Sequence, residues 1–190
     1  MVRVIDAMPA GEDLTVSVDG VKGSKTLRYG DGTPYGDVDP GSYTLRIAAP
    51  YSRKPILSRK VDLVRRQTYT FAILPRSEYG GDVVVRAIHE GGPVDPQKGQ
   101  ASIRFLSLSH ASDSLSIALN NIVAVDHLRF GVDSVPLSLQ PGDYVVKVWT
   151  EDDAPLVQPS TLHLEPGHAY TAVVMGAESA STLHLYDDHG

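Results

Sequence analysis

Pro40-Gly41-Ser42-Tyr43 and Pro141-Gly142-Asp143-Tyr144 carry the same turn-and-strand signal, 101 positions apart in a chain of 190 residues. The same spacing recurs along most of the chain and pairs Arg3 with Arg104, Leu14 with Leu115, Val16 with Ile117, Asp19-Gly20 with Asn120-Asn121, Gly30 with Gly131, and Tyr69-Thr70 with Tyr170-Thr171. Internal self-similarity at a fixed spacing indicates that one folding unit occurs more than once. We therefore predict two copies of one domain, at 1–90 and 101–190, joined by a Gly/Pro linker at 91–100.

Short runs of β-branched and alternating apolar residues fill both copies, and no stretch has helical periodicity. In the first copy the runs lie at 2–7, 14–18, 26–29, 43–48, 56–63, 69–74 and 83–88. In the second copy they lie at 102–108, 115–119, 127–130, 144–149, 160–164, 170–175 and 182–186. Short strands at regular spacing, separated by Gly, Pro, Asn and Asp, are typical of antiparallel sandwiches. The predicted fold is all-β: two tandem immunoglobulin-like, antiparallel Greek-key β-sandwiches of about seven strands each.

The turns support this prediction. Asp19-Gly20 and Asn120-Asn121 lie between apolar runs, where a tight hairpin needs residues that tolerate positive φ. Leu164 to Tyr170 resembles a tyrosine corner, in which the tyrosine hydroxyl bonds back to upstream backbone. The first copy keeps Leu63 and Tyr69 but has Arg65-Arg66 where the second has Pro166-Gly167. We expect the corner of the first copy to be the less rigid one.

Charge differs between the copies, although the net formal charge of the chain is only −6. Residues 1–100 contain 14 Lys and Arg against 12 Asp and Glu, whereas residues 101–190 contain 3 against 11. Six of the seven histidines also lie in the acidic second copy. Two interpretations stay open: ordinary surface divergence after duplication, and complementarity between a basic and an acidic face.

Several classes of function are disfavoured by composition and motif. The chain has no cysteine, which removes thiolate nucleophiles and Cys-ligated metal centres. The segment Gly20 to Thr26 lacks the spacing of a phosphate-binding loop, and no Gly-x-Ser-x-Gly elbow is present. With more acidic than basic residues and no basic-aromatic stripe, nucleic-acid binding is disfavoured as well. We predict no enzymatic activity, and no run approaches the roughly 18 apolar residues of a membrane span.

Two groups of residues have metal-ligating side chains. Asp31, Asp37 and Asp39 form an oxygen-rich loop that either binds Ca²⁺ or is simply solvated, and their spacing matches no EF-hand. The C-terminal group, which is either a transition-metal site or a disordered end, consists of His184, Asp187, Asp188 and His189. We predict the second alternative in both cases, and hence no metal and no cofactor.

Aromatic side chains are the candidates for an interaction surface. In the run from Tyr144 to Trp149, Trp149 alternates with Tyr144, Val146 and Val148 and is therefore expected to point out from the strand or to fold over the rim. The full candidate surface consists of Trp149, Tyr35, Tyr51, Tyr79, Arg65 and Arg66.

Three segments of the first copy resemble the bacterial family catalogued as domain of unknown function 4397: Arg3-Val4-Ile5-Asp6-Ala7-Met8-Pro9, Leu14 to Gly20, and Pro40 to Arg46. Members of that family typically open on Arg-Val-x-His-Ala-x-Pro, and Asp6 stands here in place of the histidine. In the second copy only Arg104 and the apolar pattern up to His110 persist. The resemblance implies an exported or envelope-anchored protein with tandem domains and no established activity.

The sequence thus favours a non-enzymatic, secreted or cell-surface structural or binding module, or a cytoplasmic protein if Met1 is native. The most specific version of this hypothesis is head-to-tail self-association of the basic first domain with the acidic second domain. The alternative is a carbohydrate-binding accessory domain that uses the exposed aromatic residues. The expected partners are accordingly protein or a cell-surface glycan.

Overall fold

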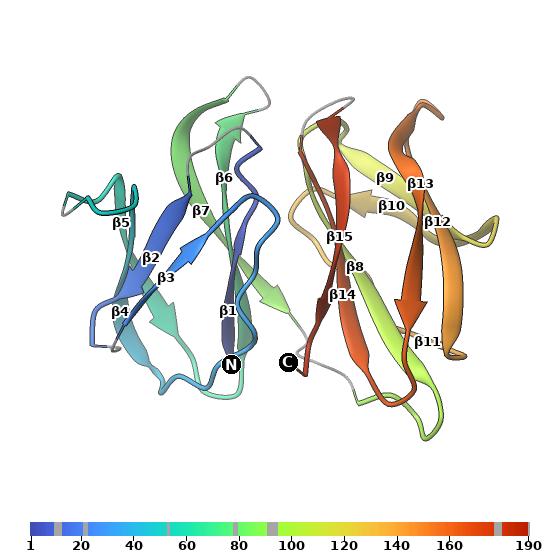
Figure 1. Cartoon of the computed structure of the whole chain (residues 1–190), viewed down its shortest axis with the longest axis horizontal. Coiled ribbons are helices and arrows are strands. Elements are labelled where there is room, and N and C mark those ends of the chain that lie inside the picture. The colour runs from blue at the N-terminus through green and yellow to red at the C-terminus, as the bar shows by residue number, and fades with distance from the viewer. Residues whose placement is uncertain are drawn as a thin grey trace. The chain divides into compact units, whose positions relative to one another are not determined.

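A computed structural model describes residues 1–9, 13–20, 23–52, 54–77, 80–90, 95–176 and 180–189 of the chain. The chain divides into two compact units, Met1–Gly92 and Pro93–Gly190, which we call domain one and domain two. All regular elements among these residues are strands (Figure 1). The two-sandwich, all-β prediction is therefore confirmed.

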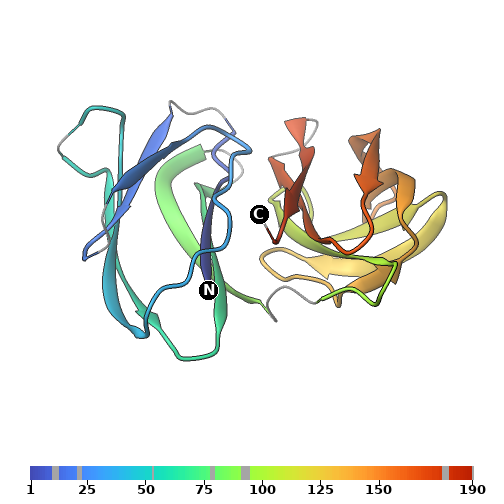
Figure 2. The ribbon, with the colours of Figure 1, turned by 60° about the horizontal axis from the view of Figure 1, so that its bottom comes forward.

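Domain one is a sandwich of two sheets, seen from a second side in Figure 2. The three-stranded sheet has the order β1-β6-β7 and the four-stranded sheet the order β3-β2-β4-β5. Its strands are β1 (Val2–Asp6), β2 (Leu14–Val18), β3 (Ser24–Leu27), β4 (Gly41–Ala48), β5 (Leu57–Leu63), β6 (Thr68–Ser77) and β7 (Gly80–Glu90). Each of the seven coincides with a predicted run to within a few residues at its ends.

Domain two repeats this plan with one more strand. Its sheets have the orders β11-β8-β14-β15 and β10-β9-β12-β13. The strands are β8 (Ala101–Ser109), β9 (Ser114–Leu119), β10 (Ile122–Arg129), β11 (Leu137–Leu139), β12 (Gly142–Thr150), β13 (Pro155–Leu164), β14 (Ala169–Gly176) and β15 (Thr182–Asp187). The sequence did not predict β11, a three-residue edge strand; in domain one its counterpart is a single bridge between Val2 and Gly36.

One pairing in each domain departs from the predicted antiparallel arrangement. β1 runs parallel to β6, and β8 runs parallel to β14, while the other strand pairs are antiparallel. A parallel pair needs a long crossover connection. Here the intervening chain supplies it, because the strands of the opposite sheet lie between the two parallel strands in the sequence.

The predicted hairpin turn is observed in domain two, where Asn120 and Asn121 take φ of 49° and 68° between β9 and β10. In domain one Gly20 has a positive φ, but the connection is longer and runs from Val18 to Ser24. Residues 21 and 22 of that connection lie outside the described residues. The two copies therefore place a turn at the same position but with different lengths.

The part of the predicted linker from Asp95 to Gln100 belongs to domain two and contacts the rest of it. The N–H of Gly167 donates to the carbonyl oxygen of Gln100 at 2.8 Å, and Asp95 lies 3.6 Å from His189. Residues 91–94 are outside the described residues.

Each sandwich encloses its own apolar core between the two sheets. The centre of the first core comprises Leu27, Leu45, Ile47, Phe71 and Ile73. The centre of the second comprises Ile103, Phe105, Leu115, Ile117 and Val146.

The repeated tyrosines fasten the loops around these cores. The hydroxyls of Tyr43 and Tyr144 donate to the carbonyl oxygens of Asp39 and Gln140, which explains the shared Pro-Gly-x-Tyr signal. The expected tyrosine corner is present in both domains. Tyr69 Oη accepts from the N–H of Val64, and Tyr170 Oη accepts from that of Glu165.

The corner of domain one contains a residue in the left-handed region. Arg66 has φ 64°, whereas Gly167, at the equivalent position of domain two, has φ 83°. A non-glycine residue with this φ is strained, so we predict that Arg66→Gly stabilises domain one by about 0.5–1 kcal/mol. The matched change Gly167→Ala should destabilise domain two by a similar amount, since open space surrounds the added Cβ and backbone strain is its main cost.

Urea unfolding of the full chain measures both changes. Far-ultraviolet circular dichroism follows both domains, while the fluorescence of Trp149, the only tryptophan, follows domain two. Equal midpoints for Arg66→Gly and the original chain would contradict the strain argument.

Candidate functional site

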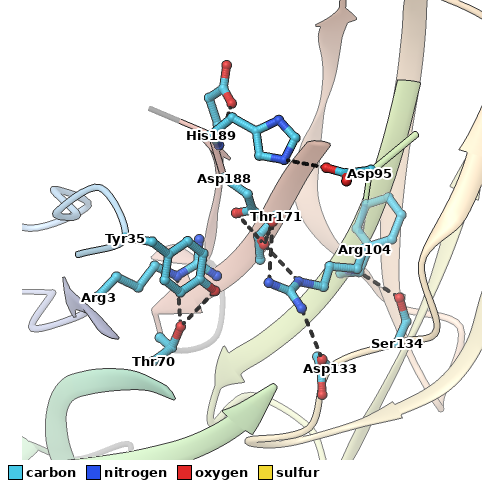
Figure 3. Close-up of polar contacts among 12 residues, drawn as sticks. Arg3, Tyr35, Thr70, Asp95, Arg104, Asp133, Ser134, Thr171, Asp188 and His189 are labelled. Atoms are coloured by element: carbon cyan, nitrogen blue, oxygen red, sulfur yellow. Dashed lines mark hydrogen bonds and ion pairs between the residues drawn. The ribbon is translucent and has the colours of Figure 1, made fainter. Parts of the chain in front are cut away.

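Domain two contains a buried arginine held by carboxylates (Figure 3). Arg104 Nε donates to Thr171 Oγ1 at 3.0 Å, and Arg104 Nη2 donates to Asp188 Oδ2 at 3.3 Å. Asp133 lies 3.8 Å from Arg104 Nη1, and the side chains of Arg104 and Asp188 are 3% and 2% exposed. Thr171 also donates to Asp188 at 2.9 Å. With its charges paired and little solvent access, this group is suited to holding strands together.

The arrangement corrects the expectation of a disordered C-terminal end. Asp188 is buried, its N–H donates to the carbonyl oxygen of Ala169, and Asp187 accepts from His168 Nδ1 at 2.6 Å. Burial raises the pKa of Asp187, but hydrogen bonds from the His189 N–H and from His168 outweigh it, so the net pKa is lowered. Residues up to 189 are therefore tied into domain two.

Domain one buries an arginine at the equivalent position, with a different neighbour. Arg3 is 1% exposed, and its Nε donates to Thr70 Oγ1 at 2.7 Å. The ring of Tyr35 lies over the guanidinium at 4.5 Å, a cation–π contact (Figure 3). Tyr35 was a candidate for a stacking surface, but its ring packs on Arg3 within the domain.

The other candidate residues do not gather at one site. Tyr51 is fully exposed on the loop between β4 and β5, and Arg65 and Arg66 are exposed in the corner of domain one. Tyr79 lies outside the described residues. The remaining candidate, Trp149, lies in domain two.

Trp149 is half-buried on β12, opposite Ser116 of β9 and Pro155 of β13. Val146 and Val148, on the other face of the strand, are core residues, so the outward direction predicted for Trp149 is observed. The indole lines a hollow of about 460 Å³, together with Lys147, Val148, Asp153, Pro155, Val157 and Pro159. An aromatic ring beside proline rings and two charged groups suits ligand binding.

Histidines of domain two lie beside carboxylates. The closest pairs are His163 Nδ1 with Asp143 Oδ1 and His168 Nδ1 with Asp187 Oδ2, both at 2.6 Å. Three wider pairs, at 3.6 Å, are His127 with Asp126, His168 with Glu165, and His189 with Asp95. Among the described residues no group of three or more His, Cys, Asp or Glu could hold a metal ion. The side chains of Asp31, Asp37 and Asp39 are accordingly not gathered into such a group.

Asp6, which the sequence analysis named only because it stands in place of the family's histidine, is a buried titratable group. It is 1% exposed, and its Oδ1 accepts from the Met8 N–H at 2.9 Å. Burial raises the pKa of Asp6 from 3.8 to about 6, more than the Met8 hydrogen bond lowers it; the charges of Asp31 and Asp13 raise it further.

Because the folded pKa exceeds the unfolded one, folding is favoured by protonation of Asp6. This stability is fully present below about pH 4 and is lost as pH rises through about 6, by up to roughly 3 kcal/mol. We predict that Asp6→Asn stabilises domain one more at pH 8 than at pH 5. Urea unfolding at both pH values tests this, and a gain independent of pH would contradict a protonation effect.

The buried ion pair gives a second prediction. Asp188→Ala leaves the Arg104 guanidinium with one less buried partner, so domain two should lose about 3–5 kcal/mol. The exposed pair of Asp143 with His163 provides the control, because Asp143→Ala should cost no more than about 1 kcal/mol. Trp149 fluorescence in urea measures both, and equal losses would contradict the structural role of Asp188.

Sequence reasoning missed Arg104, Asp188 and Asp133 as one group. Arg104 and Thr171 were recognised only as repeated positions, and Asp188 is 84 residues from Arg104 along the chain. The repeat of Arg3 as Arg104 could have identified it, because a charged residue repeated within an apolar strand indicates a structural role.

No helix of the described part of the chain is long and apolar enough to cross a membrane. The family model described as "Domain of unknown function" (DUF4397) matches the chain twice, over residues 1–118 and 101–190. No curated protein sequence matches. Among solved structures, "The Bacillus anthracis TIE protein" is similar with 12% sequence identity and a TM-score of 0.29, over 93% of this chain and 34% of that one. This chain thus spans about a third of that protein's length.

Proposed function

The chain belongs to the DUF4397 family as a tandem repeat of its domain, and we propose that it is a non-enzymatic structural or binding module. The observation that carries this proposal is the division of charge between two domains of one architecture. Residues 1–100 have a small excess of basic side chains, while residues 101–190 have 11 acidic against 3 basic ones. Two oppositely biased domains in one chain suit contact between neighbouring copies.

Some of the basic side chains of domain one lie together on one strand and its following turn. Four of them lie between positions 59 and 66, on β5 and in the tyrosine corner, and all four are exposed: Arg59, Lys60, Arg65 and Arg66. Acidic side chains of domain two are spread over several of its loops, and exposed ones include Asp113, Glu151, Asp152 and Glu165. A contact between such surfaces is attractive over about 10 Å at 0.1 M salt.

The proposed contact is head-to-tail: domain one of one copy docks on domain two of the next. A contact between two different surfaces forms a ring if its rotation closes, and a filament if it does not. The same module would operate outside the cell or at the cell envelope, as the family resemblance implies, and would act in adhesion or assembly.

Analytical ultracentrifugation at about 0.02 M and about 0.5 M salt tests the contact, because salt screens interactions between exposed charges. We expect larger species at low salt that dissociate at high salt. A protein that stays monomeric at high concentration in both conditions would contradict head-to-tail association.

Charge reversal provides a matched test. One variant carries Lys60→Glu and Arg65→Glu in domain one, and a second carries Asp152→Arg and Glu165→Arg in domain two. Each alone should remain monomeric at low salt, whereas an equimolar mixture should associate, because an acidic and a basic chain are then combined. Association of either variant alone to the original extent would show that the contact does not depend on these charges.

A further inference from the structure

The outer face of the sheet β10-β9-β12-β13 in domain two has a floor of small residues along β9 (strands labelled in Figure 1). Leu115, Ile117 and Leu119 of this strand point into the core, so Ser114, Ser116 and Ala118 point away from it. These three nevertheless have exposures of only 7%, 7% and 4%. Larger side chains of the neighbouring strands must therefore stand on both sides of them.

The strand register identifies the larger side chains on either side of this floor, which form its walls. Arg129 of β10 lies opposite Ser114, while Trp149 and Lys147 of β12 lie opposite Ser116 and Ala118. Ser116 Oγ donates to Asp126 Oδ1 at 2.5 Å, and this hydrogen bond is the main cause of the lowered pKa of Asp126. Ser114 Oγ donates to Glu151 Oε2 at 3.3 Å. The floor from Ser114 to Ala118 is roughly 13 Å long, from the rise of a strand.

One end of this face is open and polar. A hollow of about 520 Å³ is lined by Asp113, Ser114, His127, Arg129, Phe130 and Glu151. His127 has φ 53°, at an irregularity where the register of β10 shifts between Val125 and Leu128. Bulges redirect side chains and are frequent next to binding sites.

Two charged groups of this hollow, Arg129 and Asp113, are not paired as Arg28 is in domain one. Arg28, equivalent to Arg129, lies 3.6 Å from Asp13, whereas Ser114 stands at the position of Asp13 in domain two. Among the described residues, neither Arg129 nor Asp113 has an ion-pair partner. Both side chains can therefore bond to a ligand without first breaking a contact within the protein.

From this geometry we infer that the face along β9 binds a neutral oligosaccharide, with one sugar ring stacked on Trp149 and a neighbouring sugar in the polar hollow. Indole offers an apolar plane for the C–H face of a pyranose ring, and the hollow beside it is about 460 Å³. The carboxylates of Asp113 and Glu151 accept from sugar hydroxyls, and the guanidinium of Arg129 donates to them. This function is additional to the proposed head-to-tail contact and does not depend on it.

The net negative charge of domain two restricts which sugar chains can bind. With 11 acidic against 3 basic residues at positions 101–190, domain two repels a polyanionic chain. A polyproline peptide would use the apolar hollow at Trp149, but it has no N–H or O–H donor to offer the carboxylates of Asp113 and Glu151. A neutral chain of hydroxyl-bearing rings satisfies both hollows.

Fluorescence titration of the full chain tests the inference, because Trp149 is the only tryptophan and reports directly on its own site. The probes are cellohexaose and fully N-acetylated chitohexaose as neutral chains, hexagalacturonate as a polyanion, and decaproline as a peptide. We expect a saturable change in emission with at least one neutral chain and none with hexagalacturonate or decaproline.

Variants locate the bound sugar. Trp149→Ala and Arg129→Ala should each weaken binding by about tenfold or more, as measured by calorimetry, since each removes a stacking or charged hydrogen-bonding contact. Trp149→Tyr should keep most of the affinity, and it also covers the case in which Trp149→Ala does not fold. The matched control is Arg28→Ala, which removes the equivalent arginine of domain one and should leave binding unchanged.

Three results would overturn the inference. The first is no binding of either neutral chain at millimolar concentration by calorimetry and fluorescence. The second is a response of Trp149 to decaproline but not to the sugars, which would assign the face to a peptide. The third is an equal loss for Arg129→Ala and Arg28→Ala, which would place the sugar elsewhere.

Discussion

A buried guanidinium in the first strand of each domain is the constraint on which both sandwiches depend. A charge inside a protein is costly unless it is paired and hydrogen-bonded, so strands that carry its partners must be held in a fixed register. Arg3 lies directly opposite Thr70 and Arg104 directly opposite Thr171, and each Nε donates to its threonine hydroxyl across 67 residues of chain. The parallel pairings β1 with β6 and β8 with β14 are the ones that bring these side chains together.

The two copies complete this centre differently, and the difference changes how their loops are interpreted. In domain two Asp188 and Asp133 stand at the guanidinium, and Asp188 holds the chain end against β14. Domain one has Gly32 at the position of Asp133, and the ring of Tyr35 covers the guanidinium. Tyr35, a loop residue that was expected to stack on a ligand, is therefore part of the packing of domain one. Asp188, which was expected to lie in a disordered chain end, is buried in domain two.

Local and periodic features were predictable from sequence, because the residues that determine them are adjacent or at a fixed spacing. The strands, the Asn120-Asn121 turn and both tyrosine corners are of this kind. The parallel direction of β1 was not predictable, since side-chain alternation is the same in parallel and antiparallel strands. The outward direction of Trp149 followed from alternation along one strand, but the polar hollow draws on Asp113, His127 and Glu151 from separate segments and on a register shift in β10.

Comparison of the same sheet face in the two copies shows which side chains form the recess of domain two. Where domain two has Trp149 and Glu151, domain one has Ala48 and Pro50, so its face lacks the tall side chains of the β12 wall. The polar groups of that face bond to one another: Arg46 pairs with Asp19 at 2.7 Å, and Arg28 lies 3.6 Å from Asp13. A surface whose charges are mutually satisfied has little to offer a ligand, because each new bond replaces an existing one. In domain two Ser114 stands at the position of Asp13, so Arg129 lacks the ion pair that holds Arg28 and is open to a ligand.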